Sequence, residues 1–461
     1  MKGVIVVAVV AAAIVVLVGG VVGERSDVCV EFESLTMQQF LNNQPLFVVQ
    51  PATCKVSPCT GGDVGEETIR EDQLGTTSGH NAGRVHSKCV RMPGTDGASL
   101  CHWSLDWRSG KLLELLGIAY DEPDKFSRVA IVGGAGEYEH ATGSAIVMMD
   151  KDGLRRWFRL DRCIPRMNAD NCQRTLFNIA EVAPVSDVLE PAIPGTFTPG
   201  LVDSFENDLR IEGASFPANY NSGGVTGYGT YVNGYWLSKW ELEIPDRNNK
   251  ISILGPLYSQ AEAVARCIVV GGTGAWMNAK GHVMVTPHIV QGHNQFFLTY
   301  NISMEHSCKV YPFENVVHFR EMAANTKVVP SHTNENGIKS AGDERLFVDN
   351  LFQSYERERD IPMDARISGR CRLMNDSISE FCEWIIEYPP ADEPSGKDAS
   401  QLVLIGRIMD DPSTASPVMI IGGTGLWENA IGNGTFTPNY RSPVQTSGLL
   451  VGDWDLQYTY A

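Results

Sequence analysis

The sequence lacks the short motifs that mark several common enzyme classes. It contains no G-x-S-x-G, no H-E-x-x-H and no C-x-x-C, which argues against serine hydrolase, zinc protease and thioredoxin-type chemistry. Basic residues are scarce, with 37 Lys+Arg against 55 Asp+Glu, and the net charge of −18 argues against nucleic-acid binding because phosphate backbones repel such a chain. The 45 glycines follow no G-X-Y period, so a collagen-like helix is excluded.

Long apolar runs are also missing, except for one at the start of the chain. Residues 3–22 are uncharged and mostly Val, Ala, Ile and Gly, and small residues precede Glu24. This pattern predicts a secretory signal peptide over 1–23, although residues 3–22 are also long enough to serve as a membrane anchor. Both interpretations send the remainder of the chain across a membrane, so we expect a secreted, extracellular protein.

One sequence pattern occurs three times. Residues 131–143 read IVGGAGEYEHATG, 269–281 read VVGGTGAWMNAKG, and 420–432 read IIGGTGLWENAIG. Each copy follows an apolar segment that ends in glycine: LELLG, ISILG or LVLIG. The spacing of the copies is that of whole domains, which predicts three tandem copies of one domain. The motif glycines are Gly133, Gly134, Gly136, Gly143, Gly271, Gly272, Gly274, Gly281, Gly422, Gly423, Gly425 and Gly432.

We place the three domains at 27–165, 173–310 and 328–461, with an insertion at 50–83 in the first. Each contains about six segments that alternate or run apolar as strands do, and none shows a helical period over three turns. Residues 322–365 look like a charged linker with a short helix. Antiparallel strands around one core avoid exposed edges best by closing into a barrel, so we expect an all-β fold.

The glycine motif itself has two interpretations. A hydrophobic strand that runs into GGTG is similar to the phosphate loop of extended short-chain dehydrogenases, but no helix has room to follow it here. A tight turn between two strands fits better, with the Trp or Tyr of the motif closing one end of a barrel. We therefore expect no nucleotide cofactor. His282, His288 and His293 lie close in sequence without a carboxylate pattern, so we expect no metal site.

These residues resemble a known family. The string VVGGTGAWMNAKG, with its preceding LG-strand and following hairpin, is similar to the dirigent proteins of plants, which share a barrel fold with the allene oxide cyclases. The resemblance covers roughly the last 80 residues of each copy. It implies eight-stranded antiparallel barrels with an apolar pocket. It also implies that a reactive phenolic intermediate is bound and steered in its coupling or cyclisation, while a separate oxidase supplies the radicals.

The resemblance also implies site residues. Dirigent proteins carry an Asp after the Gly-ended strand and an Arg before the glycine strand, both lining the pocket. Asp121 and Arg128 match these positions in the first copy, and Tyr120 precedes the acid. The second copy keeps only Arg266 and the third only Asp410, so we expect activity in the first copy. The alternative is a loop acid and a cation at the barrel rim without a catalytic role.

The cysteines predict two disulfide bonds. RVHSKCVRM aligns with RISGRCRLM, and CHW aligns with CEW, so Cys89–Cys101 and Cys371–Cys382 are equivalent pairs in the first and third copies. The second copy lacks both cysteines, which suits a bond that is present or absent as a unit. Weaker guesses are Cys163–Cys172, Cys54–Cys59 and Cys267–Cys308, with Cys29 left over. Sequons that predict glycosylation are Asn301, Asn375 and Asn433.

Three functions remain open from the sequence. The first is a directing or cyclase-like protein, and the second a non-catalytic secreted protein that binds a small molecule or a glycan. The third is a matrix protein in which the barrels are only stable modules. Inward-pointing buried Asp or Arg favours chemistry, whereas a filled barrel interior favours a module. We also expect the three barrels to pack together within one chain, because fusion raises their effective concentration.

Overall fold

The computed structural model describes most of the chain between Cys29 and Tyr460. Among these residues, no helix is both long and apolar enough to cross a membrane. The expected signal or anchor segment lies outside them. The residues that the structure does not describe are 1–28, 42–46, 50–63, 94–96, 121, 124, 154, 166–172, 185–187, 190–201, 212–222, 232–234, 245–248, 259, 261, 290–294, 307–314, 330–342, 356–358, 375–378, 389–399, 410, 412–413, 439–449 and 461.

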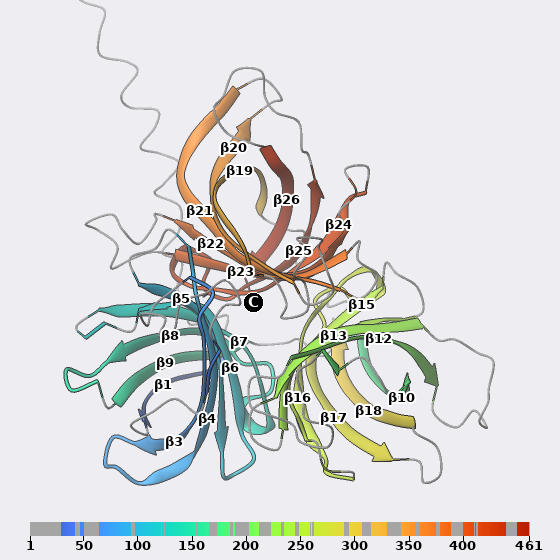
Figure 1. Cartoon of the computed structure of the whole chain (residues 1–461). Coiled ribbons are helices and arrows are strands. Elements are labelled where there is room, and N and C mark those ends of the chain that lie inside the picture. The colour runs from blue at the N-terminus through green and yellow to red at the C-terminus, as the bar shows by residue number, and fades with distance from the viewer. Residues whose placement is uncertain are drawn as a thin grey trace, which may run out of the picture.

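The chain forms three closed antiparallel barrels of eight strands each, as predicted (Figure 1). In barrels 1 and 2 a short extra strand pairs at the edge of the second barrel strand. Barrel 1 contains β1 (Cys29–Phe40), β3 (Glu67–Thr76), β4 (Asn81–Arg91), β5 (Ala98–Trp107), β6 (Leu112–Tyr120), β7 (Phe126–Ala135), β8 (Thr142–Met149) and β9 (Arg155–Pro165), with short β2 (Phe47–Val49). Barrel 2 contains β10 (Gln173–Pro184), β12 (Val202–Ile211), β13 (Gly223–Tyr231), β14 (Tyr235–Glu243), β15 (Lys250–Tyr258), β16 (Ala265–Gly272), β17 (Lys280–Ile289) and β18 (Gln295–His306), with short β11 (Val188–Leu189). Barrel 3 contains β19 (Asn315–Val329), β20 (Glu344–Tyr355), β21 (Arg359–Leu373), β22 (Ser379–Tyr388), β23 (Ser400–Met409), β24 (Ser416–Gly423), β25 (Ala430–Pro438) and β26 (Leu450–Tyr460).

The structure differs from the predicted division of the chain in two places. The proposed insertion at 50–83 contains β3 and the start of β4, and both are barrel strands. The proposed charged linker at 322–365 contains most of β19 and β20, and β19 begins before the predicted start of the third domain. Strands β3 and β20 carry buried charged side chains, among them Glu67, Asp72, Glu344 and Asp349, so their polar composition hides them from a hydrophobicity pattern.

Each glycine motif makes the turn that the sequence predicts. A single 3-10 turn follows the glycine pair in every barrel: η2 (Gly136–Tyr138), η4 (Gly274–Trp276) and η7 (Gly425–Trp427). The first residue of each turn is a glycine with φ between 59° and 70°, a conformation that favours glycine. Tyr138 and Trp427 are buried at the barrel end, and the Tyr138 ring packs edge-on against Trp107 with centroids 5.1 Å apart.

The three barrels share one apolar core in addition to their own interiors. Each barrel interior has its own cluster of buried side chains. A fourth cluster joins outward-facing side chains of all three barrels, and Figure 1 shows the barrels arranged around a common centre. Members of this fourth cluster include Leu116 and Val132 of barrel 1, Leu254 and Val270 of barrel 2, and Ile405, Met419 and Ile421 of barrel 3.

The contacts around this centre run in a cycle. The first glycine of each motif pair faces the glycine-motif strand of the next barrel. A Cβ at Gly133 would lie 2.7 Å from Ile268 of barrel 2, and one at Gly271 would lie 3.3 Å from Met419 of barrel 3. A Cβ at Gly422 would lie 3.4 Å from Ala130 of barrel 1. The barrels therefore follow a pseudo-threefold arrangement, and these glycines allow the close approach.

A lysine is buried at this centre. The pairing of β6 with β7 shifts register at Glu114/Leu115, which makes Val132 a β-bulge. The equivalent shift between β23 and β24 of barrel 3 makes Ile421 a β-bulge. Lys280 of barrel 2 donates to both of these carbonyls, at 3.2 Å each. Burial lowers the pKa of Lys280 from 10.5 to about 7.

Buried polar contacts also join every pair of barrels. The side chains involved are all nearly inaccessible to solvent, so each must be satisfied by a partner across the boundary. These contacts are Arg370 to Glu67 at 2.6 Å between barrels 3 and 1, Lys88 to Thr230 at 2.7 Å between barrels 1 and 2, and Lys239 to Glu383 between barrels 2 and 3.

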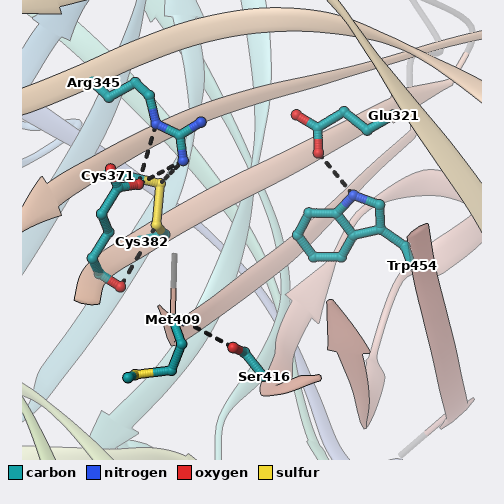
Figure 2. The surroundings of a disulfide bond; sticks show 8 residues. Glu321, Arg345, Cys371, Cys382, Met409, Ser416 and Trp454 are labelled. Atoms are coloured by element: carbon teal, nitrogen blue, oxygen red, sulfur yellow. Dashed lines mark hydrogen bonds and ion pairs between the residues drawn. A yellow bond between two sulfur atoms is a disulfide. The ribbon is translucent and has the colours of Figure 1, made fainter. Parts of the chain in front are cut away.

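Both predicted disulfide bonds are confirmed. Cys89 faces Cys101 across β4 and β5, and the pair forms a bond. Cys371 faces Cys382 across β21 and β22, and Figure 2 shows the bond between them. Gly229 and Ser238 occupy the same facing positions in barrel 2. The guess that Cys267 pairs with Cys308 is wrong, because Cys267 is a free thiol inside barrel 2 that donates to the Pro256 carbonyl at 3.1 Å. Cys54, Cys59, Cys172 and Cys308 lie outside the described residues.

The second glycine of the motif pair offers a test of the turn. A Cβ at Gly134 would lie 2.2 Å from the Tyr138 carbonyl oxygen and 2.8 Å from that of Leu112, both backbone atoms that cannot move without opening the turn. We expect Gly134→Ala to lower the free energy of unfolding by about 1–3 kcal/mol, measured by urea denaturation. Gly422→Ala is the control, because its nearest contacts are at 3.4 Å. Equal losses in the two variants would contradict the assigned role.

Candidate functional site

Tyr120 and Arg128, two of the residues that the resemblance singles out, do not point into the interior of barrel 1. Tyr120 packs against the apolar cluster shared by the barrels, and Arg128 lies on the same outer face of β7 as Ala130 and Val132. The side chains that point into barrel 1 at this level are Ala119 and Val129. The two side chains do not line a pocket inside the barrel as expected, and their catalytic role stays a prediction. Asp121 and Asp410 lie outside the described residues.

Other predicted positions lie on the surface or at barrel boundaries. Arg266 is exposed and reaches from β16 to barrel 1. Among the predicted glycosylation sites, Asn301 is exposed, Asn433 is half-buried and Asn375 lies outside the described residues. His282 pairs with Glu139 of barrel 1 at 2.7 Å, so this histidine links two barrels.

The barrel interiors contain a polar pair at the same place in all three copies. The first strand of each barrel supplies one member of the pair: Gln39, Glu181 or Glu321. Each faces a leucine of the second strand that points into the barrel, namely Leu74, Leu209 or Leu351. The second strand supplies the partner two residues before that leucine. The three hydrogen-bonded pairs are Gln39–Asp72, Glu181–Asn207 and Glu321–Asp349.

A tryptophan lies inside each barrel with the polar pair. Trp103, Trp240 and Trp384 occupy equivalent positions, and each is at most 1% exposed. The Nε1 atoms of Trp103 and Trp240 are buried without a hydrogen-bond partner. Such unsatisfied donors are uncommon in protein interiors, so the neighbourhood of the polar pair has unused hydrogen-bonding capacity in barrels 1 and 2.

Barrel 1 combines an acid with a cation. The Gln39 amide donates to the Asp72 carboxylate at 2.6 Å, and Arg156 donates to the Gln39 carbonyl at 3.4 Å. The Arg156 guanidinium also lies over the Trp103 ring, 5.7 Å from its centroid. All four side chains are at least 96% buried, so their charges act in a medium of low dielectric constant.

Barrels 2 and 3 carry buried acids with raised pKa values at these positions. Burial raises the pKa of Glu181 from 4.5 to about 7, although hydrogen bonds from Tyr300 and Asn207 oppose the shift. Burial, together with the nearby Asp349 carboxylate, raises the pKa of Glu321 to about 8. Trp454 donates to Glu321 at 2.9 Å, as Figure 2 shows. At pH 7 Glu181 is therefore about half protonated and Glu321 is mostly protonated.

A cavity adjoins the polar pair of barrel 1. It has a volume of about 530 Å³, within the range of small-molecule sites, and lies at strands β3 to β5. Asp72 is among its lining residues, and the Asp72 carboxylate accepts from Gln39 in the barrel interior. Most of the lining is polar. The other lining residues are Glu71, Gln73, Asn81, Gly83, Arg84, Asp106 and Arg108.

A short sequence pattern marks the second member of the interior pair in all three copies. Each second strand carries the pattern [DN]-x-L: Asp72-Gln-Leu74, Asn207-Asp-Leu209 and Asp349-Asn-Leu351. The pattern is short, and in the first copy it falls in the stretch interpreted as an insertion. Only the strand register shows that these residues share a position.

Comparisons with known proteins add little to this geometry. No protein-family model matches the chain, and no curated protein matches it. Among solved structures, a pyocyanin demethylase is similar at 20% sequence identity, covering 32% of this chain and 100% of that one, with a TM-score of 0.22. A TM-score of this size supports no inference from that protein to this one.

The buried acid of barrel 2 predicts a pH dependence. The native pKa of Glu181, about 7, lies above its ordinary value of 4.5, so the native state holds a proton that the unfolded state releases. The stability from this proton is fully present below pH 4.5 and is lost as pH rises to 7, by up to about 1.4 kcal/mol per pH unit. We expect Glu181→Gln to remove this slope from urea-denaturation midpoints measured between pH 4.5 and 7.

Barrel 1 provides the precedent for that variant, because Gln39 stands at the same position. Glu321→Gln should remove a separate slope that extends to pH 8. An unchanged slope in both variants would contradict the assignment of these protons.

Proposed function

We propose that barrel 1 binds a small hydroxylated aromatic molecule at the cavity lined by Asp72 and directs its coupling or cyclisation. The observation that carries the proposal is the contact of this cavity with an acid backed by Gln39 and Arg156. The likeness of the glycine motifs to dirigent proteins supports the same reaction class. A secreted location, glycosylation and a partner oxidase belong to this proposal.

The chemistry assigned to the site is positioning and proton transfer. Asp72 accepts a hydrogen bond or a proton from a phenolic hydroxyl, and Gln39 holds the carboxylate in place. Arg156, which donates to Gln39, stabilises negative charge that develops at the site. The oxidant is external: two equivalents of a one-electron acceptor each take one electron from a phenol, which also loses its hydroxyl proton. The two phenoxyl radicals then form one bond as the site orients them.

A second candidate is a glycan-binding function. The observation that favours it is the lining of the cavity, where carboxylates, amides and guanidinium groups outnumber apolar side chains. Such a surface suits a ligand with many hydroxyl groups. In this case Asp72 accepts hydrogen bonds from the glycan and no reaction follows.

A coupling assay separates the two candidates. The probe is 4-propenylphenol, oxidised by ferricyanide, with the enantiomeric excess of the dimer measured by chiral chromatography. We expect a non-racemic product with the native protein and a clear fall in enantiomeric excess with Asp72→Asn. Affinity for the phenol, measured by calorimetry, should fall about tenfold, the effect expected for a lost hydrogen bond to a charged group.

The matched control is Asp349→Asn, which removes the equivalent carboxylate from barrel 3. It should leave the product distribution unchanged. A racemic product with the native protein, together with binding of neutral oligosaccharides that Asp72→Asn abolishes, would establish the glycan-binding function instead. Identical behaviour of the Asp72 and Asp349 variants would overturn both.

A further inference from the structure

Arg266 of barrel 2 reaches into the edge of barrel 1. Its guanidinium donates to the Gly110 carbonyl, in the turn that joins β5 and β6, at 2.5 Å. A Cβ at either Gly110 or Gly136 would lie 3.4 Å from the same Arg266 nitrogen, so the guanidinium fits between two glycine turns of barrel 1. Gly110 and Gly136 have φ of 79° and 70°, and side chains there would both strain the backbone and crowd the arginine.

This contact lies beside the cavity at Asp72. Arg108, two residues before Gly110 in the same turn, lines the cavity, and so does Asp106 at the end of β5. Burial raises the pKa of Asp106, Glu114 adds to the rise, and the positive charges of Arg84 and Arg266 oppose it. The barrel 2 cation is therefore close enough to act on a cavity carboxylate.

A second residue of barrel 2 is near the same cavity wall. Tyr258, at the end of β15, is 37% exposed. Burial raises the pKa of Tyr258, and the negative charge of Asp106 adds to the rise, whereas Arg84 opposes it. Both of these charged residues line the cavity, so its outer edge adjoins barrel 2.

We propose that the ligand site of barrel 1 is composite, and that Arg266 of barrel 2 is a positioning residue for it. By holding the Gly110 turn, Arg266 fixes the places of Asp106 and Arg108 at the cavity edge. The inference rests on the function proposed for the cavity. It assigns Arg266 a role in the first barrel, whereas sequence matching treats it as a remnant of a site in the second.

The cyclic arrangement gives the barrels different residues at this contact. The positions equivalent to Arg266 are Arg128 in barrel 1 and Pro417 in barrel 3. Following the cycle of glycine contacts, barrel 2 receives the proline of barrel 3, which has no donor. Barrel 3 receives Arg128, but its matching turn lies outside the described residues. Barrel 1 receives an arginine, and it is the barrel with the described cavity and the acid–cation pair.

The test compares Arg266→Met with Arg159→Met in the full chain, since Arg159 is an exposed arginine of barrel 1 that lies near Asp161 and does not line the cavity. We expect Arg266→Met to weaken binding of 4-propenylphenol about three- to tenfold and to lower the enantiomeric excess, while Arg159→Met changes neither. Arg266→Lys should restore part of the affinity, because its ammonium can still reach the Gly110 carbonyl. Unfolding midpoints are measured for all variants, so that a general loss of stability is separated from a change at the cavity.

Two readouts test the inference without a ligand. Carboxyl NMR should show a higher pKa for Asp106 in Arg266→Met, because a nearby positive charge is removed. The Gly110 amide, which donates to the Trp107 carbonyl at 2.9 Å, should exchange faster with solvent. If both are unchanged, the inference is overturned whatever the ligand. If both change while the native protein neither binds nor directs the phenol, the proposed function fails and the composite edge stands.

Discussion

The packing of three barrels around one centre is the constraint on which the rest of this structure depends. Strand β7 of barrel 1 and its equivalents bury both faces, one in the barrel and one in the shared cluster. The approach is closest at Gly133, where a Cβ would lie 2.7 Å from Ile268, and the backbone carbonyls that the bulges expose require partners. Lys280 supplies two of those hydrogen bonds. The motif thus serves both the barrel turn and the contact between barrels.

The three barrels share one fold, but the polar residues inside them differ. The register keeps a polar pair at the same depth in each barrel, but the residue types differ. In barrel 1 an arginine lies near an amide and an acid, whereas barrels 2 and 3 hold acids whose burial raises their pKa to about 7 and about 8. Since burial penalises an unpaired charge, the residue types at this one position give the three interiors different electrostatics.

The boundary between barrels 1 and 2 links assembly to the candidate site. The cavity lies on strands β3 to β5, and residues of β15 and β16 adjoin its edge. A single barrel would lack the arginine that holds the Gly110 turn. Fusion of the copies also permits each boundary to differ, which a symmetric trimer of identical chains does not allow.

The sequence by itself determined the repeat, the all-β class, the motif turns and the pairing of Cys89–Cys101 and Cys371–Cys382. These follow from local patterns: glycine spacing, alternation, and cysteines that are present or absent together. It did not determine the polar strands β3 and β20, because their buried charged residues find partners inside their own barrel or, like Glu67, in another barrel, and such strands are not apolar enough to be recognised. Tertiary structure alone decided which face Tyr120 and Arg128 occupy, that Asp72 lies beside a cavity, and that Arg266 serves a neighbouring barrel. The physical reason is that strand register and barrel packing set these positions, and neither is encoded within one short stretch of chain.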